Sequence, residues 1–389
     1  MQDKLTPRQV RAWSLCALSV PAAMALPGCG WLWVLGGSIL ACALAACQQA
    51  MQRHSGLCMR QAFARAFGAG GGRIMAAAEL LWLLFAASGA AAASQIAFED
   101  DLGPFLPAIP LLLAALAGQK GRLAAGRVCA VLALCLAGLY AVIAAASLRH
   151  VQADWSRPQG VPADAALAFC LCLGQACMAF VTAEDEVPRI SFGAAAASAL
   201  LPAVPTFLTA ACLSPELARQ EPLPFLTLTK SLSVLSVMQR FELLLSVAQL
   251  LGLFALLTML VCAAERMLGA VRRKNGTGST GGVFCLLAFG GSFLAYRLPI
   301  WSWAVGAAIF WGVVPILTQV IVNIKKSEMD GLEATRIIRE ISREIPIIAL
   351  TAFAFDDDRV KALEAGCNDY LTKPLSAPLL KETIVKYLI

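Results

Sequence analysis

Two apolar segments of the sequence carry helix-breaking residues, and the chemistry that they offer is anion binding by main-chain amides. The first segment contains Pro21, Pro27 and Gly28, and the second, CLCLGQACMAF, contains Gly174 followed by Gln175. A broken helix frees N–H groups and exposes the positive end of a half-helix dipole, which can hold a carboxylate without any charged side chain. Pro and Gly are also frequent in ordinary membrane helices, so the pattern leaves helix packing open as the alternative.

No catalytic or metal-binding set accompanies these residues in the sequence. The two histidines, His54 and His150, lie in hydrophilic gaps far apart in the chain, and no two cysteines have the C-x-x-C spacing of a zinc site. Most of the fourteen cysteines lie within apolar runs, where they are expected to behave as small hydrophobic residues. We therefore expect no enzymatic activity, no bound metal and no cofactor.

The composition indicates that the elements around these residues are solvated by lipid. Hydrophobic residues make up 59% of the 389 residues and charged residues 14%, whereas a soluble domain averages about 45–50% and about 25%. The formal charge of +6 is spread over short gaps between apolar runs, so it does not predict nucleic-acid binding. The N-terminal segment lacks an A-x-A cleavage site, and we expect no removable signal peptide.

Hydropathy predicts about ten membrane-spanning helices, because an apolar run of 18 or more residues can cross roughly 30 Å of hydrocarbon. The predicted spans are residues 11–29, 31–47, 74–97, 102–117, 126–147, 165–183, 190–213, 240–264, 283–297 and 300–323. An even number of spans places both termini on the same side of the membrane.

The distribution of basic residues predicts which side that is. With the N-terminus inside, the inner segments before residue 327 hold seventeen Lys and Arg residues and the outer segments hold six. Because positive residues favour the cytoplasmic side, this bias predicts that both termini are cytoplasmic.

Three segments between or within the spans have further expected roles. Residues 48–73 suit an amphipathic helix on the inner surface or an inner loop, and the Pro-containing stretch 214–239 suits a surface helix or a re-entrant cover. Glu79 lies close to the inner end of the third span. We expect it to reach the inner interface or to pair with Arg73; facing a cavity or coupling to protons is the alternative.

The segments LTPRQVRAWSLCALSVPAAMALPG, PFLTLTKSLSVLSVMQRFELL and WGVVPILTQVIVNIKK resemble the permease-like B subunit of spore germinant receptors. That family is a ten-helix branch of the amino acid-polyamine-organocation transporter superfamily, which is built from inverted repeats. The resemblance covers about residues 4–326. It departs from the family at the start of the eighth helix, where Gln239 and Arg240 stand in place of the usual Glu-Arg pair.

This resemblance implies a receptor that binds an amino acid or a similar small germinant in a transporter-type pocket. It also implies other germinant-receptor subunits as partners in the spore inner membrane. The residues that it suggests for the pocket lie on the first and sixth spans, and ordinary helix packing is the alternative role. They are Ser19, Ala22, Ala23, Gly174, Gln175 and Cys177.

The chain changes character after Lys326, and residues 327–389 contain no run long enough to span a membrane. Helical periodicity in GLEATRIIREI is followed by the strand-like run IPIIALTA, the helical DDDRVKALEAG, the strand-like DYLTKP and a final helical stretch. This alternation indicates βα units on a parallel sheet. Asp356 is suited to begin a helix and Gly366 to end one.

The motifs MDG, ALTA and EAGCNDYLTKP resemble the second half of a response-regulator receiver domain. The resemblance gives Thr351 the role of orienting phosphoryl oxygens and Lys373 that of the positive charge beside them. It places Asn323 where the family has its phosphoacceptor Asp. Asn lacks the anionic oxygen that would attack phosphorus, so we expect no aspartyl phosphorylation.

The run QVIVNIKK would have to be both the end of the last membrane helix and the third receiver strand, and its length and flanking lysines favour the helix. About 65 residues of the receiver then remain, which is little for an independent core. A fused or truncated gene accounts for this junction most simply.

The sequence therefore predicts an all-α polytopic membrane domain over residues 1–326 and a partial receiver domain over residues 327–389. The favoured function is that of a germinant-receptor membrane subunit with a non-phosphorylatable receiver tail. The alternatives are a membrane-tethered two-component regulator, whose receiver a second chain completes, and a secondary transporter of amino acids.

Overall fold

The structure is a computed structural model that describes residues 5–26, 28–97, 105–152, 160–177, 192–221, 223–232, 241–272, 280–327, 331–342, 344–351, 356–372 and 377–388. The chain divides into two compact units, Met1–Val322 and Asn323–Ile389, and each is described by itself.

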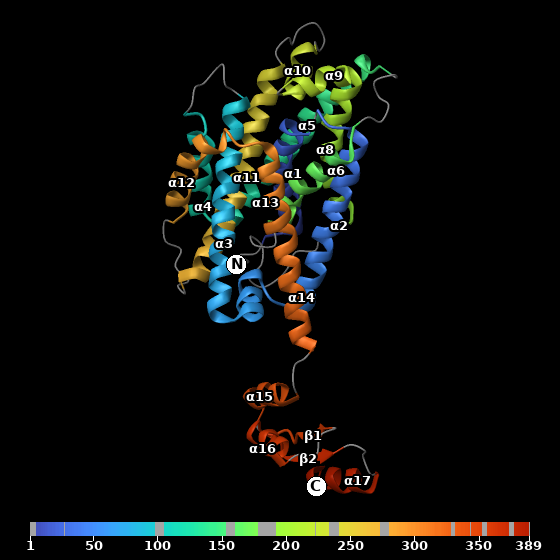
Figure 1. The fold of residues 1–389 in the computed structure, drawn as a ribbon, viewed down its shortest axis with the longest axis vertical. Helices are drawn as coiled ribbons and strands as arrows, with labels where there is room; N and C mark the ends of the chain where they lie inside the picture. The colour runs from blue at the N-terminus through green and yellow to red at the C-terminus, as the bar shows by residue number, and fades with distance from the viewer. Residues whose placement is uncertain are drawn as a thin grey trace. The chain divides into compact units, whose positions relative to one another are not determined.

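The first unit is helical (Figure 1), and each of the ten predicted spans overlaps a helix in the part of the chain that the structure describes. Pro27, Arg240 and residues 102–104, 178–183 and 190–191 of these predicted spans lie outside the described residues. The helices that form the bundle are α1 (Pro7–Met24), α2 (Trp31–Ser55), α3 (Met59–Ala97), α4 (Ala108–Gln119), α5 (Arg122–Ser147), α6 (Pro162–Cys172), α8 (Phe192–Cys212), α11 (Phe241–Arg272), α12 (Thr280–Ala295), α13 (Ile300–Ala307) and α14 (Val314–Ser327). Short 3-10 segments follow α5 (η1, Leu148–His150) and α6 (η2, Leu173–Cys177), and a π-helical segment joins α13 to α14 (η3, Ala308–Val313).

Length and composition make this unit an integral membrane protein. Among the described residues, five continuous helical segments are long and apolar enough to cross a bilayer, and four more helices are apolar but shorter. Large apolar side chains also point outward from these helices: Leu134 on α5 is 77% exposed and Leu286 on α12 is 72% exposed. Water would disfavour such a surface, whereas lipid tails solvate it.

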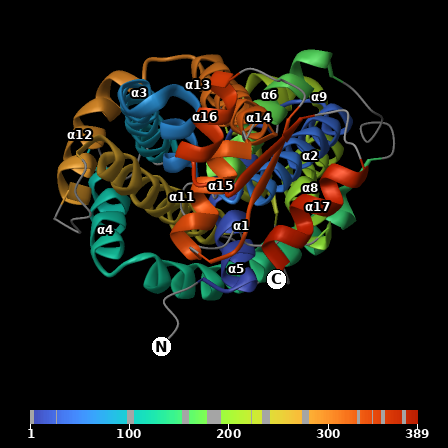
Figure 2. The same ribbon diagram turned by 90° about the horizontal axis from the view of Figure 1, so that it is seen from below.

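Helix α11 lies at the centre of the bundle. It packs against α3, α1, α4 and α12, while α2 packs against α6 and α8, as Figures 1 and 2 show. The indole N–H of Trp13 on α1 donates to the carbonyl of Ala255 on α11 at 2.9 Å. Because hydrocarbon offers this donor no partner, the bond ties the two helices together inside the bundle.

Helices α3 and α13 approach each other closely because each has a glycine at the contact. A Cβ built on Gly306 of α13 would lie 2.1 Å from the ring of Trp82, and one built on Gly89 of α3 would lie 2.5 Å from Trp303. Small residues at helix contacts are the usual device for close packing in membranes. Each indole therefore occupies the space that a side chain on the facing helix would otherwise fill.

The backbone tests two predictions about local structure, one in the first span and one in the segment 48–73. Helix α1 continues through Pro21 and ends at Met24, so the predicted break at Pro21 is wrong, whereas the helix does end before Pro27 and Gly28. A proline removes one main-chain hydrogen bond, and membrane helices can tolerate this loss. Residues 59–67 form a short helix that a kink at Gly68 (φ 75°) separates from the rest of α3, so this part of the segment is helical rather than a loop.

The predicted cover over residues 214–239 contains two short helices, α9 (Pro215–Gln220) and α10 (Pro224–Ser231). The hydroxyl of Ser214 accepts from the N–H of Leu217 and caps α9. Phe225 and Leu228 of α10 are buried against Ala23 of α1 and Leu245 of α11. The segment is therefore anchored to the bundle by an apolar face.

The second unit follows the predicted alternation of helices and strands. Its elements are α15 (Gly331–Ile341), β1 (Ile348–Thr351), α16 (Asp356–Glu364), β2 (Asp369–Thr372) and α17 (Ala377–Leu388). The two strands are parallel, with Ile348 opposite Asp369 and Thr351 opposite Thr372. Asp356 begins α16 and Gly366 follows it with φ +103°, as the sequence predicts.

Arg339 connects the elements of this second unit. Its guanidinium donates to the carbonyl of Gly366 at 2.8 Å, to the carbonyl of Ile345 at 2.7 Å and to the side chain of Asn368. The Asn368 side-chain oxygen also accepts from the N–H of Ile347 at 2.8 Å. One side chain of α15 thus holds together the loops that lead into β1 and β2.

We predict that Gly306→Ala destabilises the bundle, because its methyl group would overlap the Trp82 ring. Overpacking of this kind typically costs about 1–3 kcal/mol. Thermal unfolding in detergent measures the change, and Gly290→Ala on α12, where a Cβ meets nothing within 4 Å, is the matched control. Equal melting temperatures for the two variants would show that α3 and α13 do not meet at this glycine.

Candidate ligand pocket in the membrane unit

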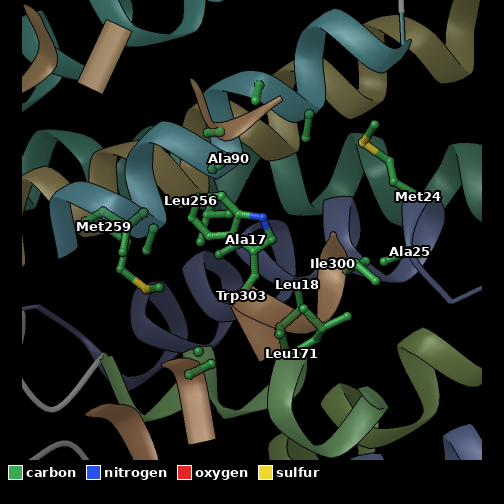
Figure 3. A pocket seen from close by; sticks show the side chains of 18 of the residues that line it. Ala17, Leu18, Met24, Ala25, Ala90, Leu171, Leu256, Met259, Ile300 and Trp303 are labelled. Atoms are coloured by element: carbon green, nitrogen blue, oxygen red, sulfur yellow. The ribbon is translucent and has the colours of Figure 1, made fainter. Parts of the chain in front are cut away.

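A cavity of about 400 Å³ lies inside the bundle, within the range of about 300–1,000 Å³ that is usual for small-molecule sites. Ala17 and Leu18 come from α1, Ala90 from α3, and Leu256 and Met259 from α11, and Figure 3 shows these side chains around the space. Its lining is mainly apolar, with Ser14 and Tyr296 as hydroxyl-bearing exceptions. The site therefore suits a small ligand with an apolar body.

Alanine and glycine on α3 make the space. Ala86, Gly89, Ala90 and Ala93 line the cavity, and their spacing of three and four residues places them on one face of the helix. Larger side chains at these positions would fill the cavity. The cavity therefore results from a stripe of small residues on a helix that otherwise carries Leu, Phe and Trp.

A cluster of aromatic rings forms another part of the cavity wall. The ring centroids of Trp82 and Trp311 lie 5.5 Å apart in an edge-on arrangement, and Phe310 stacks on Trp82 at 5.5 Å. The indole N–H groups of Trp82 and Trp311 have no hydrogen-bond partner in the part of the chain that the structure describes. Two unused donors in an apolar wall are unusual, because a buried N–H normally finds an acceptor.

Two of the three described segments that depart from α-helical geometry, η2 and η3, meet at this cavity. Gly174 lies in the 3-10 segment η2 and Trp311 in the π-helical segment η3, and both line the space. A Cβ on Gly174 would lie 3.4 Å from the Trp311 ring. Irregular backbone at membrane depth is tolerated where it is buried in protein or lines a cavity, and π segments often occur at functional sites.

Of the six pocket residues suggested by the sequence, Gly174 lines the cavity. Ser19 is buried, and its hydroxyl donates to the carbonyl of Cys16 at 2.6 Å. Ala23 packs against the apolar face of α10, and Cys177 lies in the main hydrophobic core. The side chains of Ala22 and Gln175 lie outside the described part of the structure.

The sequence analysis did not single out Trp82, Trp303 or Trp311, all of which line the cavity. A signal for them exists in the sequence. Tryptophan in membrane proteins is enriched at the two interfaces, whereas Trp82 and Trp311 fall well inside the predicted spans 74–97 and 300–323. A tryptophan at such a depth is a candidate for lining an internal site.

The receiver-like residues do not form a phosphorylation site in the described residues. Asn323 lies on helix α14, where the receiver family would have a strand, and Thr351 is the last residue of β1. Lys373 and the side chain of Thr351 lie outside the described residues. Within the described ranges, no group of three or more His, Cys, Asp or Glu side chains could hold a metal ion.

Comparison with known families confirms the two resemblances seen in the sequence. Residues 166–289 match the spore germination protein family. The fold is similar to that of MHP1, a nucleobase-cation-symport-1 family transporter, whose structure is of a closed conformation with bromovinylhydantoin bound. The TM-score is 0.57 at 14% sequence identity, over 81% of this chain and 77% of that chain. The membrane unit therefore has a transporter fold.

Residues 318–385 match the response regulator receiver domain family. Over 71 residues the chain is 41% identical to the polar-differentiation response regulator DivK of Brucella ovis and of Brucella suis, and 39% identical to that of Brucella anthropi. These 71 residues are 18% of this chain and 58% of each relative. The chain thus spans less than two thirds of the receiver proteins that it matches.

We predict that the purified full chain takes up no phosphate from acetyl phosphate. Asn323→Asp should not restore uptake, because the new carboxylate would lie on helix α14 without the acidic pair that binds magnesium in the family. Radiolabelled phosphate incorporation measures this, with an intact receiver protein as the positive control. Labelling of either chain would show that a complete acceptor site forms.

Proposed function

We propose that the membrane unit is the permease-like subunit of a spore germinant receptor and that its cavity binds an amino acid or a similar small germinant. The observation that carries the proposal is the cavity at the meeting point of η2 and η3 in a transporter fold. The match of residues 166–289 to the spore germination protein family supports a role in germination.

The mainly apolar lining of the cavity favours, among amino acids, a neutral one with an apolar side chain. Burying a side chain such as that of leucine contributes about 1.5–3 kcal/mol, and each net hydrogen bond about 1 kcal/mol. Both contributions favour binding, and the free-energy cost of immobilising the ligand opposes them. The unused N–H groups of Trp82 and Trp311 are the wall's available donors for an acceptor oxygen, once their rings turn towards the ligand.

The proposed setting is the spore inner membrane, with both termini cytoplasmic and with other germinant-receptor subunits as partners. The excess of basic residues in alternate gaps supports this orientation. The proposed role is sensing rather than catalysis, because most residues around the cavity are Ala, Leu, Met and Trp, and no described Asp, Glu, His, Lys or Cys lies beside the hydroxyl groups of Ser14 and Tyr296 in its lining.

A membrane-tethered two-component regulator is the second candidate, and the receiver match favours it. Leu350 of β1 and Val360 of α16 are each about half exposed. A second chain that supplied the first half of a receiver would cover such residues. Secondary transport is the third candidate, and uptake of labelled amino acid against a gradient in proteoliposomes would distinguish it from sensing.

We predict that L-leucine changes the tryptophan fluorescence of the full chain in lipid nanodiscs in a saturable manner. Gly174→Leu should weaken this binding at least about tenfold, because the side chain fills the cavity. Gly174→Ala should leave it nearly unchanged, since its Cβ makes only an ordinary contact with Trp311.

Gly138→Leu on α5, where a Cβ meets nothing within 4 Å, controls for a general effect of leucine on a membrane helix. L-alanine and L-phenylalanine extend the test to smaller and larger side chains. The proposal fails if none of the three amino acids gives a saturable signal, or if Gly174→Leu binds as tightly as the unchanged protein.

A further inference from the structure

Glu79 is the one acidic residue of the described membrane helices whose side chain is completely buried. It lies on α3 three residues before Trp82, so the two side chains share a face of the helix and Glu79 is about one turn beyond the cavity wall. The sequence analysis expected this carboxyl at the inner interface or paired with Arg73. The structure buries it with 0% exposure, and this expectation is wrong.

Both carboxyl oxygens of Glu79 lack a hydrogen-bond partner among the described residues. The helices packed against α3 are α11, α12, α4 and α13. Among the titratable groups of the described residues, Cys177 of η2 is close enough to interact with the Glu79 charge. Glu265 of α11 interacts instead with Cys262 of α11 and with Cys285 of α12, and Arg266 of α11 and Arg122 of α5 interact with Cys262. No cation of the described part faces Glu79.

An ionised carboxylate in this position would be shielded from solvent and, among the described residues, would have no positive charge beside it. Such an arrangement is strongly unfavourable, and a buried carboxyl avoids it by holding a proton. The neutral carboxyl has one O–H donor and no acceptor for it in the described residues, so it too is poorly satisfied. Acidic residues kept inside membrane helices at this cost commonly serve proton or ion pathways.

We infer that Glu79 is a proton-exchange site next to the cavity. In the arrangement seen here, in which Glu79 is buried, the carboxyl carries a proton. When the helices around η2 separate and water reaches the site, the O–H bond breaks, the bonding pair stays on the carboxylate and the proton passes to a water molecule. Return to the buried arrangement requires that the proton be taken up again. The inference does not depend on which ligand the cavity binds.

Infrared spectroscopy of the full chain in lipid nanodiscs tests this inference directly. At neutral pH the unchanged protein should show the C=O stretching band of a protonated carboxylic acid, and the band should shift in D₂O because the proton exchanges. Glu79→Gln should remove this band. Glu265→Gln, which changes a half-buried acid on α11, is the matched control and should retain it.

Three results would overturn the inference. The first is a carboxylic-acid spectrum of Glu79→Gln that is identical to that of the unchanged protein. The second is a Glu79 band that fails to shift in D₂O. The third is that Glu79→Gln fails to fold while Glu79→Asp folds, because glutamine mimics the neutral carboxyl and should be tolerated if that form is the native one.

We predict in addition that alkaline pH removes the Glu79 band and increases exposure of Cys177, which a maleimide probe can measure. The physical reason is that the ionised carboxylate favours the hydrated arrangement over the buried one. Glu79→Gln should reduce the rise of Cys177 labelling with pH to that expected from ionisation of the thiol alone, whereas Glu265→Gln should leave the rise as it is in the unchanged protein. Equal pH dependence in Glu79→Gln would contradict the assignment to Glu79.

Discussion

The structure of the membrane unit depends on one constraint: hydrocarbon offers no hydrogen-bond partner to the peptide backbone. Continuous helices satisfy that constraint, and the described spans obey it with two kinds of exception. The 3-10 segment Leu173–Cys177 and the π segment Ala308–Val313 depart from α geometry, and both lie beside the cavity. The backbone geometry of these two segments is less favourable than that of an α-helix. In return, a small molecule in the cavity can contact irregular main chain and small side chains.

Polar side chains follow the same constraint. Trp13 satisfies its indole N–H on the backbone of α11, and Ser19 satisfies its hydroxyl on its own helix. Seven described residues have buried side-chain atoms without such a partner in the described part of the chain, and Trp82, Trp311 and Glu79 are three of them. Trp82 and Trp311 line the cavity, and Glu79 lies about one turn beyond its wall on the same helix as Trp82. Their cost to folding is the reason to assign them a role in binding and proton exchange rather than in stability.

The sequence predicted what depends on local pattern. Apolar runs located the spans, and alternating periodicity located α15, β1, α16, β2 and α17, because hydropathy and period are properties of neighbouring residues. The cavity depends on packing between distant segments. Trp82 and Trp311 are 229 positions apart in the numbering, and nothing local says that Gly306 lets α13 approach Trp82. The predicted break at Pro21 was wrong because a local pattern does not show that the surrounding helices tolerate a proline that would break an isolated helix.

The central claim is that the space between η2 and η3 is a ligand site rather than a packing defect. Hydrogen–deuterium exchange of the full chain in lipid nanodiscs, with and without L-leucine, tests it most directly. The account predicts that the amino acid slows exchange in peptides covering Leu173–Cys177 and Ala308–Val313 and leaves α5 unchanged. Exchange that is the same with and without L-leucine, or slowed on α5 instead, would contradict it.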